Sequence, residues 1–362
     1  MRDCRLRRGR RCHRPRQPSQ GGRLATRMRP TAAGPVGAWI GMRSIISRVA
    51  ARTVACTFAR IGSFAAVLLI VASPLFVGSR TARGEETPLR ILTHNVYVGF
   101  KNVSPEAKSA WRDWVASQRP DIVALQELSG YTPAQLEADA ASWGHAHSAL
   151  HNDARFPVGL TSRWPLERVA SLEQGFHRAV LRADAAGLTV YAVHLHPSNW
   201  QARIDEAKRI GEDIASLGRP DPRVVLAGDF NGFSPADREA YGSSPGLVPF
   251  FKRLDERIPG DRNLHDGQID YGGIQTVLDL GFLDAAVRFR GADGLGPTFP
   301  TAVVATADHG PPRRLDYIFV SENLGPALRG CRVLDDDTTA RFSDHAPVIA
   351  DLVLPVTPES SR

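Results

Sequence analysis

The segment RVVLAGDFN, residues 223–231, joins a run of small and branched apolar residues to two polar ones. The apolar part has the length and composition of a buried β-strand. Because side chains alternate along a strand, Asp229 and Asn231 are expected on one face. A buried strand has no structural need for these side chains at its end, which makes them candidates for a functional site at the edge of a sheet.

Five further strand-like runs begin or end in polar residues of the same kinds. They are LRILTHNVYVG (89–99) with Asn95, RPDIVALQE (119–127) with Glu127, LTVYAVHLH (188–196) with His194 and His196, RRLDYIFVS (313–321) with Arg314 and Asp316, and RFSDHAPVIADLVL (341–354) with Asp344 and His345. Each residue alone could be an ordinary strand-end or interior polar group. Their recurrence in one domain favours a shared site. Carboxylates, imidazoles and amides without cysteine suit a hard divalent cation, with Mg²⁺ or Mn²⁺ ahead of Zn²⁺.

Helix signals lie between these runs, and the alternation of strands and helices is typical of an α/β domain. The predicted helices run from a Ser104 cap and Pro105 to near Gln118, from the capping-box signal Thr132, Pro133 and Gln135, and over 200–217 with Gly218 as the stop. The irregular stretch 291–312 is expected to be a surface loop near the site.

The ordered set of an Asn at 95, QE (126–127), HLH (194–196), GDFN (228–231), LDYIF (315–319) and SDHAPV (343–348) resembles the endonuclease/exonuclease/phosphatase superfamily. The resemblance covers roughly 89–354. It implies a four-layer α/β sandwich, in which two mixed β-sheets pack face to face and helices flank them. It also implies a metal-dependent phosphoesterase similar to secreted nucleases, apurinic endonucleases, inositol-polyphosphate 5-phosphatases and neutral sphingomyelinases.

The resemblance implies a metal centre and assigns its ligands. Glu127 would be the principal ligand of Mg²⁺ or Mn²⁺, with Asn95 beside it. Asp344 would hold a second ion or orient His345. One or two ions are compatible with these residues.

The resemblance also implies catalytic roles. Asp229 would position and deprotonate the attacking water, and Asn231 and His194 would hydrogen-bond the phosphoryl oxygens. His345 would contact the scissile phosphate, and Asp316 would be the partner of a histidine or help to protonate the leaving group. Four more residues are candidates for substrate contact, each with a structural role as the alternative: Arg178, His196, Asn199 and Arg314.

Positive charge is concentrated at the beginning of the chain. Residues 1–84 contain 17 Lys and Arg and one acid, so of the chain's 45 basic and 38 acidic residues, 28 and 37 remain beyond residue 84. The formal charge of +7 therefore belongs to the leader, and the acidic remainder weakly disfavours non-specific binding of polyanions. Three of the four cysteines also lie in the leader, and Cys331 is expected to be a packed, small apolar residue.

The leader has the features of an export signal. A start at Met42 gives a basic stretch, then an apolar run at 61–77, then Ala82 and Gly84 three and one positions before Glu85. We expect residues 1–84 to be a disordered leader with a signal peptide, cleaved near Gly84, and 85–362 to be an exported phosphoesterase domain. An uncleaved membrane anchor at 61–77 is the alternative.

The sequence leaves the substrate open between a nucleic acid, a phospholipid headgroup and an inositol phosphate. A nuclease or general phosphodiesterase is the leading hypothesis, although no Lys/Arg-rich stretch with aromatics is present beyond the leader. The alternative is a phosphatase or phospholipase C-like enzyme acting on inositol phosphates or sphingomyelin, for which Trp200 is a candidate membrane contact. A non-catalytic binding module is disfavoured because the key positions are intact. We expect a monomer without an obligate protein partner.

Overall fold

A computed structural model describes residues 86–101, 103–151, 156–289, 296–301 and 309–355. The predicted leader, its cleavage near Gly84 and the alternative anchor at 61–77 lie outside these residues. Across the described ranges, no helix combines the length and the apolar character that a membrane crossing requires.

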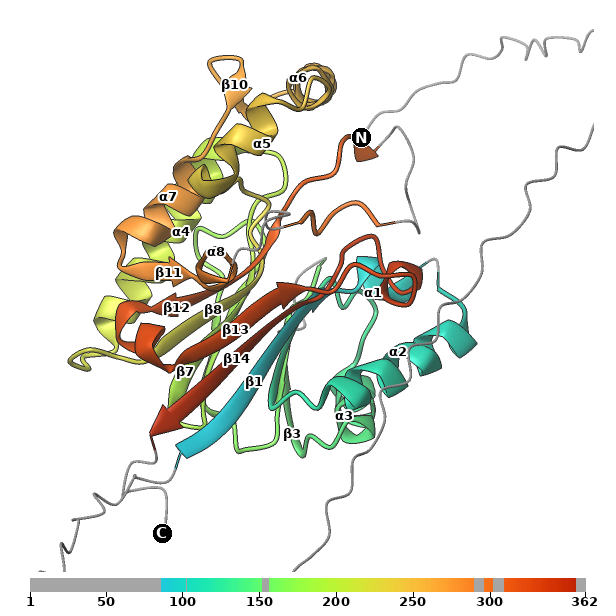
Figure 1. Ribbon diagram of the computed structural model, residues 1–362, viewed down its shortest axis with the longest axis vertical. Helices are drawn as coiled ribbons and strands as arrows, with labels where there is room; N and C mark the ends of the chain where they lie inside the picture. The colour runs from blue at the N-terminus through green and yellow to red at the C-terminus, as the bar shows by residue number, and fades with distance from the viewer. Residues whose placement is uncertain (1–85, 102, 152–155, 290–295, 302–308, 356–362) are drawn as a thin grey trace, which may run out of the picture. The chain divides into compact units, whose positions relative to one another are not determined.

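Two six-stranded mixed sheets form the centre of the domain (Figure 1). The first sheet has the order β13 (Leu328–Val333), β14 (Val348–Pro355), β1 (Glu86–Asn95), β2 (Ile122–Gln126), β4 (Gly159–Ser162) and β3 (His147–Leu150). The second has the order β11 (Phe282–Asp284), β12 (Asp316–Ser321), β8 (Val224–Asp229), β7 (Leu188–His194), β6 (Val180–Ala185) and β5 (Glu167–Leu172). In each sheet one pair is parallel, β1 with β2 and β7 with β8, and the other named pairs are antiparallel.

Helices cover the outer face of each sheet, which completes the predicted four-layer sandwich. The apolar core between the sheets includes Ile91, Val190 and Ile318. The outer face of the first sheet packs against α2 (Pro105–Gln118) and α3 (Pro133–Ser142), and that of the second against α4 (Trp200–Ser216) and α7 (Gly272–Asp279). Alternation along β1 sends Ile91 into the core between the sheets and Leu92 into the outer one. The fold class predicted from the sequence is therefore confirmed.

The predicted helix starts are confirmed by their caps. The hydroxyl of Ser104 accepts a hydrogen bond from the backbone N–H of Ala107 at 3.2 Å. Thr132 and Gln135 form a reciprocal capping box at the start of α3. Asn199 caps α4, which ends just before Gly218, whose φ is +64°.

The remaining elements are mostly short. They are α1 (Tyr97–Phe100), η1 (Pro235–Asp237), α5 (Arg238–Gly242), α6 (Leu247–Arg257), β9 (Leu264–His265), β10 (Gln268–Ile269), α8 (Ala285–Arg288), η3 (Glu322–Ala327) and η4 (Thr339–Arg341). The longest of them is α6. The helices α5 and α6 and the β9–β10 hairpin share an apolar cluster that includes Phe233, Leu247 and Phe299. This cluster lies beside the segment that leads into β12, where the predicted site begins.

Candidate active site

Strand register brings the predicted site residues to one rim of the sandwich. Asn95 pairs with Gln126 at the shared end of the parallel strands β1 and β2, directly before Glu127. In the second sheet His194 pairs with Asp229, and Asp229 pairs with Asp316 at the start of the antiparallel strand β12. The ends of β1 and β2 in the first sheet, the ends of β7 and β8 in the second, and the start of β12 therefore all lie at this rim.

Backbone geometry at this rim depends on special conformations. Gly228 has a φ of +154°, and a Cβ at this position would collide with the carbonyl oxygen of Val193 on the neighbouring strand. Only glycine allows β7 and β8 to approach so closely before Asp229. Glu127 follows β2 and Asn231 lies just beyond β8. Their φ values are positive, 60° and 47°, so the backbone turns sharply at each position.

Asp229 lies at the centre of the site. Its Oδ2 accepts a hydrogen bond from Nδ2 of Asn95 at 3.1 Å, and its Oδ1 accepts one from the backbone N–H of Asn231 at 2.8 Å. Nε2 of His194 lies 3.5 Å from Oδ2. Burial raises the pKa of the Asp229 carboxyl to about 7; the positive charge of His345 opposes the shift, and the negative charge of Asp316 adds to it. The carboxylate is therefore held in place and poised to accept a proton near neutral pH.

Asp316 and His345 form a hydrogen-bonded pair beside Asp229. Nδ1–H of His345 donates to Oδ2 of Asp316 at 2.7 Å, and Nε2 lies 3.8 Å from Oδ2 of Asp229. Burial lowers the pKa of His345, but the charges of Asp316 and Asp229 outweigh it and raise the pKa to about 10. The ring of Phe299 packs on the imidazole, with centroids 4.7 Å apart. His345 is therefore a protonated, well-oriented hydrogen-bond donor at neutral pH.

Glu127 and Asp344 lie on the first-sheet side of the rim. Oε2 of Glu127 accepts a hydrogen bond from the backbone N–H of Val98 at 2.9 Å, while Oε1 lies 3.7 Å from Nη1 of Arg178 and 3.8 Å from Nε2 of His194. Burial raises the pKa of Asp344 to about 6; the charge of His345 opposes the shift and that of Glu127 adds to it. A cation near both carboxylates would relieve their repulsion.

The donor set suits a metal ion. Among the described residues, Asp229, Asp316 and His345 offer ligand atoms that all lie within 4.8 Å of one another. Oδ1 of Asp316 is buried and accepts no hydrogen bond from the described part of the chain. The predicted ligands Glu127 and Asp344 lie outside this tight group. Carboxylates with an uncommitted buried oxygen are the ligands that hard divalent cations prefer.

Arg178 joins the site, as the sequence suggested. Its guanidinium contacts the ring of His194 and lies 4.1 Å from the ring centroid of Phe156, which covers its face. Burial, and then the charge of Arg178, hold the pKa of His194 well below its usual value. His194 is therefore a neutral imidazole, and Arg178 supplies positive charge that can face a phosphoryl group.

Two other predicted substrate contacts, Arg314 and Asn199, have structural partners. Arg314 is 2% exposed and forms ion pairs with Asp237 and Asp284 at 2.9 and 2.7 Å, which give it a structural role; its role as a substrate contact stays a prediction. Asn199 accepts the capping bond of α4 and donates to Asp261 at 3.3 Å. Neither side chain reaches the group around Asp229.

His196 contacts residues other than the partners of His194. β7 ends at His194, so the expected alternation no longer applies two residues later. The ring of His196 instead packs on that of His177, with centroids 4.0 Å apart. Asn231 likewise lies beyond the end of β8 and donates its side-chain amide to the carbonyl oxygen of Leu195 at 3.0 Å.

Sequence reasoning missed several residues that shape the site. Thr298 accepts hydrogen bonds from the backbone N–H groups of Leu315 and Asp316 at 2.9 and 3.1 Å, and the backbone N–H of Thr301 donates to the carbonyl of Asp344 at 2.9 Å. These contacts confirm that the described part of the predicted loop at 291–312 borders the site. The prediction of that loop was the only signal that could have located them.

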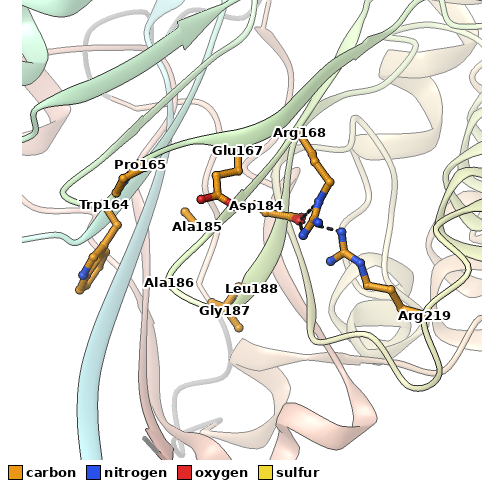
Figure 2. Close-up of a pocket in the computed structure, with 10 residues that line it drawn as sticks. All are labelled: Trp164, Pro165, Glu167, Arg168, Asp184, Ala185, Ala186, Gly187, Leu188 and Arg219. Atoms are coloured by element: carbon orange, nitrogen blue, oxygen red, sulfur yellow. Dashed lines mark hydrogen bonds and ion pairs between the residues drawn. The ribbon is translucent and has the colours of Figure 1, made fainter. Parts of the chain in front are cut away.

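A separate cavity of about 440 Å³ lies at the other end of the second sheet. Its lining includes Leu188 at the start of β7, whereas the site residue His194 is at the end of that strand. Figure 2 shows Arg168 and Arg219 converging on Asp184 there. The ion pairs tie the β5–β6 hairpin to the segment after α4, which is a sufficient structural role for them.

Comparisons with known proteins agree with this architecture. Residues 92–345 match the model of the Endonuclease/Exonuclease/phosphatase family. The fold is similar to a 3′ phosphatase from Neisseria bound to a product DNA hairpin (22% identity, 73% of this chain and 99% of that chain, TM-score 0.51). It is also similar to an AP endonuclease from Archaeoglobus fulgidus (21% identity, 72% and 98%, TM-score 0.53). A search of curated proteins finds no match.

Proposed function

The chain belongs to the endonuclease/exonuclease/phosphatase family and is a hydrolase of phosphoester bonds, and we propose that it is a divalent-metal-dependent nuclease or general phosphodiesterase. The observation that carries the proposal is the arrangement around Asp229. This carboxylate accepts hydrogen bonds from Asn95 and Asn231 and lies beside the His345–Asp316 pair.

The groups at the rim have complementary chemical roles. Asp229 acts as the general base for the attacking water, because its raised pKa of about 7 suits proton transfer near neutral pH. The protonated His345, held by Asp316, donates a hydrogen bond to the phosphoryl group and stabilises the charge that develops there. Asn231, His194 and Arg178 supply further hydrogen bonds and positive charge.

A divalent cation, Mg²⁺ or Mn²⁺, is proposed to bind on the first-sheet side of the rim. Asn95, Glu127 and Asp344 are the proposed ligands, because their oxygen atoms are of the kind that hard divalent cations prefer, whereas Nδ1 of His345 is already hydrogen-bonded to Asp316. One oxygen of Asp316 accepts a hydrogen bond from His345, and the other oxygen, which is buried, is available to a second ion. When bound, the cation would polarise the phosphoryl oxygen and offset negative charge.

Trp200 bears on the choice of substrate class. Its ring is stacked on that of His265 with centroids 3.8 Å apart and an interplanar angle of 12°. The hairpin that carries His265 turns at Asp266, whose side chain is 97% exposed. An acidic tip beside a covered tryptophan is poorly suited to entering a lipid surface. This favours a soluble phosphodiester over sphingomyelin. The Neisseria relative is bound to a DNA product, so DNA is the first substrate to test.

A substrate panel tests the proposal. The domain 85–362 is assayed with DNA, RNA, bis-p-nitrophenyl phosphate, sphingomyelin and inositol phosphates, with Mg²⁺ or with EDTA. We expect hydrolysis of the nucleic acids and of the synthetic diester, and its loss in EDTA. Turnover limited to inositol phosphates or sphingomyelin would support the alternative substrate class, and absence of hydrolysis throughout would contradict the catalytic proposal.

We also propose that the domain is exported. The support is the sequence alone: the apolar run at 61–77 followed by Ala82 and Gly84. N-terminal sequencing of the protein from a bacterial host should give a chain that begins near Glu85. Recovery of a chain that retains residues before 61 would contradict cleavage.

A further inference from the structure

His94 is a buried polar residue on a face of β1 where an apolar side chain is expected. Its neighbours on the same face, Leu92 and Val96, belong to the apolar cluster under α2. His94 is fully buried. Burial of an imidazole at this position is unfavourable unless both ring nitrogens have partners.

Both nitrogens do have partners, and these partners fix the tautomer. The indole N–H of Trp111, from α2, donates to Nδ1 of His94 at 3.0 Å. Nδ1 therefore has no proton, and the proton of the neutral ring is on Nε2. Nε2–H lies 3.1 Å from the backbone carbonyl oxygen of His345 and donates to it. The Trp111 indole thus occupies Nδ1 and leaves Nε2–H to donate to the carbonyl of His345.

The main chain of His345 is consequently held at two points by β1. On one side its carbonyl accepts from His94. On the other, its N–H donates to the hydroxyl of Ser343 at 3.2 Å, and that hydroxyl donates to the carbonyl of Asn95 at 2.6 Å. Residues 94 and 95 therefore fix the backbone from which the His345 imidazole reaches Asp316.

We propose that His94 is a positioning residue, locked by Trp111 in the Nε2–H tautomer, that holds the backbone of His345 so that its imidazole faces Asp316 and Asp229. The inference rests on the function proposed above, because it assigns no chemistry to His94 itself. The simpler reading is a core histidine that contributes only stability. The two readings differ in what happens to turnover in a folded variant.

Two substitutions at His94 separate the roles of its nitrogens. In His94→Gln the amide nitrogen lies near the place of Nε2 and can still donate to the carbonyl of His345. In His94→Asn the shorter amide lies near Nδ1 and cannot reach that carbonyl. The matched control is His145→Asn. His145 is also a buried histidine with two hydrogen bonds, to Thr161 and Pro120, but Pro120 lies just before the start of β2, whereas the site lies at the end of that strand.

Two measurements are made on the domain 85–362: kcat and KM for bis-p-nitrophenyl phosphate, and the low-field proton resonance of the His345–Asp316 hydrogen bond by NMR. We expect His94→Asn to lower kcat by about 10- to 100-fold at nearly unchanged KM and to shift or broaden the resonance. His94→Gln should retain most of the turnover and the resonance. His145→Asn should lower the melting temperature only.

Unchanged kcat and resonance in folded His94→Asn, or an equal loss of kcat in His145→Asn, would overturn the proposal. If His94→Asn does not fold, Trp111→Phe provides the test. Loss of the indole donor removes the partner that fixes the His94 ring at Nδ1, so kcat should fall and the resonance should change; a normal resonance would again overturn the proposal. His345→Ala separates this inference from the proposed function. Full turnover in His345→Ala would contradict the catalytic role of His345, whereas the resonance in the His94 variants would still show whether His94 positions the His345 imidazole.

Discussion

Nδ2 of Asn95 donates a hydrogen bond to Oδ2 of Asp229 at 3.1 Å and thereby joins the two sheets of the sandwich at their rim. Asn95 ends β1 in the first sheet, and Asp229 ends β8 in the second. The proposed metal ligands and the proposed base thus come from different sheets and meet through one contact. A shift of one sheet against the other would separate the groups, so packing in the core between the sheets supports the site directly.

Asp229→Asn tests the general base. The substitution keeps the shape of the side chain and removes the proton acceptor, so turnover should fall by at least ~10²-fold. Both oxygens of Asp229 accept hydrogen bonds, so the new amide must face one donor, at a cost of about 1–3 kcal/mol in unfolding free energy. Steady-state kinetics and thermal melts check both effects. Asp205→Asn, on the exposed face of α4, is the control, and near-normal turnover of Asp229→Asn would point to another base.

Glu127→Gln tests the proposed metal ligand. The amide can still accept the hydrogen bond from Val98, so the turn at residues 96–100 should be retained. Loss of one negative charge should raise the Mg²⁺ concentration needed for half-maximal activity, and excess Mg²⁺ should restore part of the activity through Asn95 and Asp344. Activity is titrated against Mg²⁺ beside wild type and Glu137→Gln, an exposed residue of α3. Superimposable curves for Glu127→Gln and wild type would exclude Glu127 as a ligand.

Arg314 and Arg178 should respond differently to substitution. Arg314→Ala leaves Asp237 and Asp284 without their buried partner and should destabilise the domain by about 3–5 kcal/mol, with KM of the folded fraction unchanged. Arg178→Lys keeps a positive charge but loses the flat guanidinium that stacks on Phe156, so KM should rise with a smaller loss of stability. Chemical unfolding and kinetics of both variants provide the comparison. A raised KM in the folded fraction of Arg314→Ala would support Arg314 as a substrate contact.

The sequence located the rim of the site better than it located individual side chains. Asp229 and His194 end their strands, and Asp316 begins one, so each of these polar residues adjoins an apolar run. The register of the strands brings the three residues together. The same alternation failed for His196 and Arg314, because each lies outside its strand and the period of two does not extend into a turn. In physical terms, a strand fixes the direction of its own side chains, whereas turn geometry depends on tertiary contacts.

Long-range contacts were also beyond the sequence. Thr298 and Phe299 support Asp316 and His345, but no local pattern connects residues so far apart in the chain. The pairing of Trp111 with His94 is of the same kind, since a helix and a strand meet there only after folding. Helix caps, by contrast, are local, and Ser104 and Thr132 were predicted correctly.

His145 gives the domain a specific sensitivity to acid that is independent of the active site. Nε2–H of His145 donates to the carbonyl of Pro120 at 3.0 Å, and Nδ1 lies 2.7 Å from the hydroxyl of Thr161, which can donate to it, so both nitrogens of a neutral ring have partners. Burial is the main cause that lowers its pKa below the usual value. In the unfolded chain the ring titrates near its ordinary pKa of about 6.5.

The sign of the effect follows from these two pKa values. Below pH ~6.5 the unfolded chain takes up a proton at His145 that the folded domain does not. The contribution of His145 to stability is therefore complete above that pH. It is lost as the pH falls towards the lowered pKa of the folded state. For one proton the slope is at most about 1.4 kcal/mol per pH unit. His145→Asn removes this titration while leaving the other histidines in place. Urea unfolding of metal-free wild type and variant at pH 5, 6, 7 and 8 should therefore give curves of stability against pH that converge as the pH falls. Parallel curves would show that His145 does not titrate differently in the folded and unfolded states.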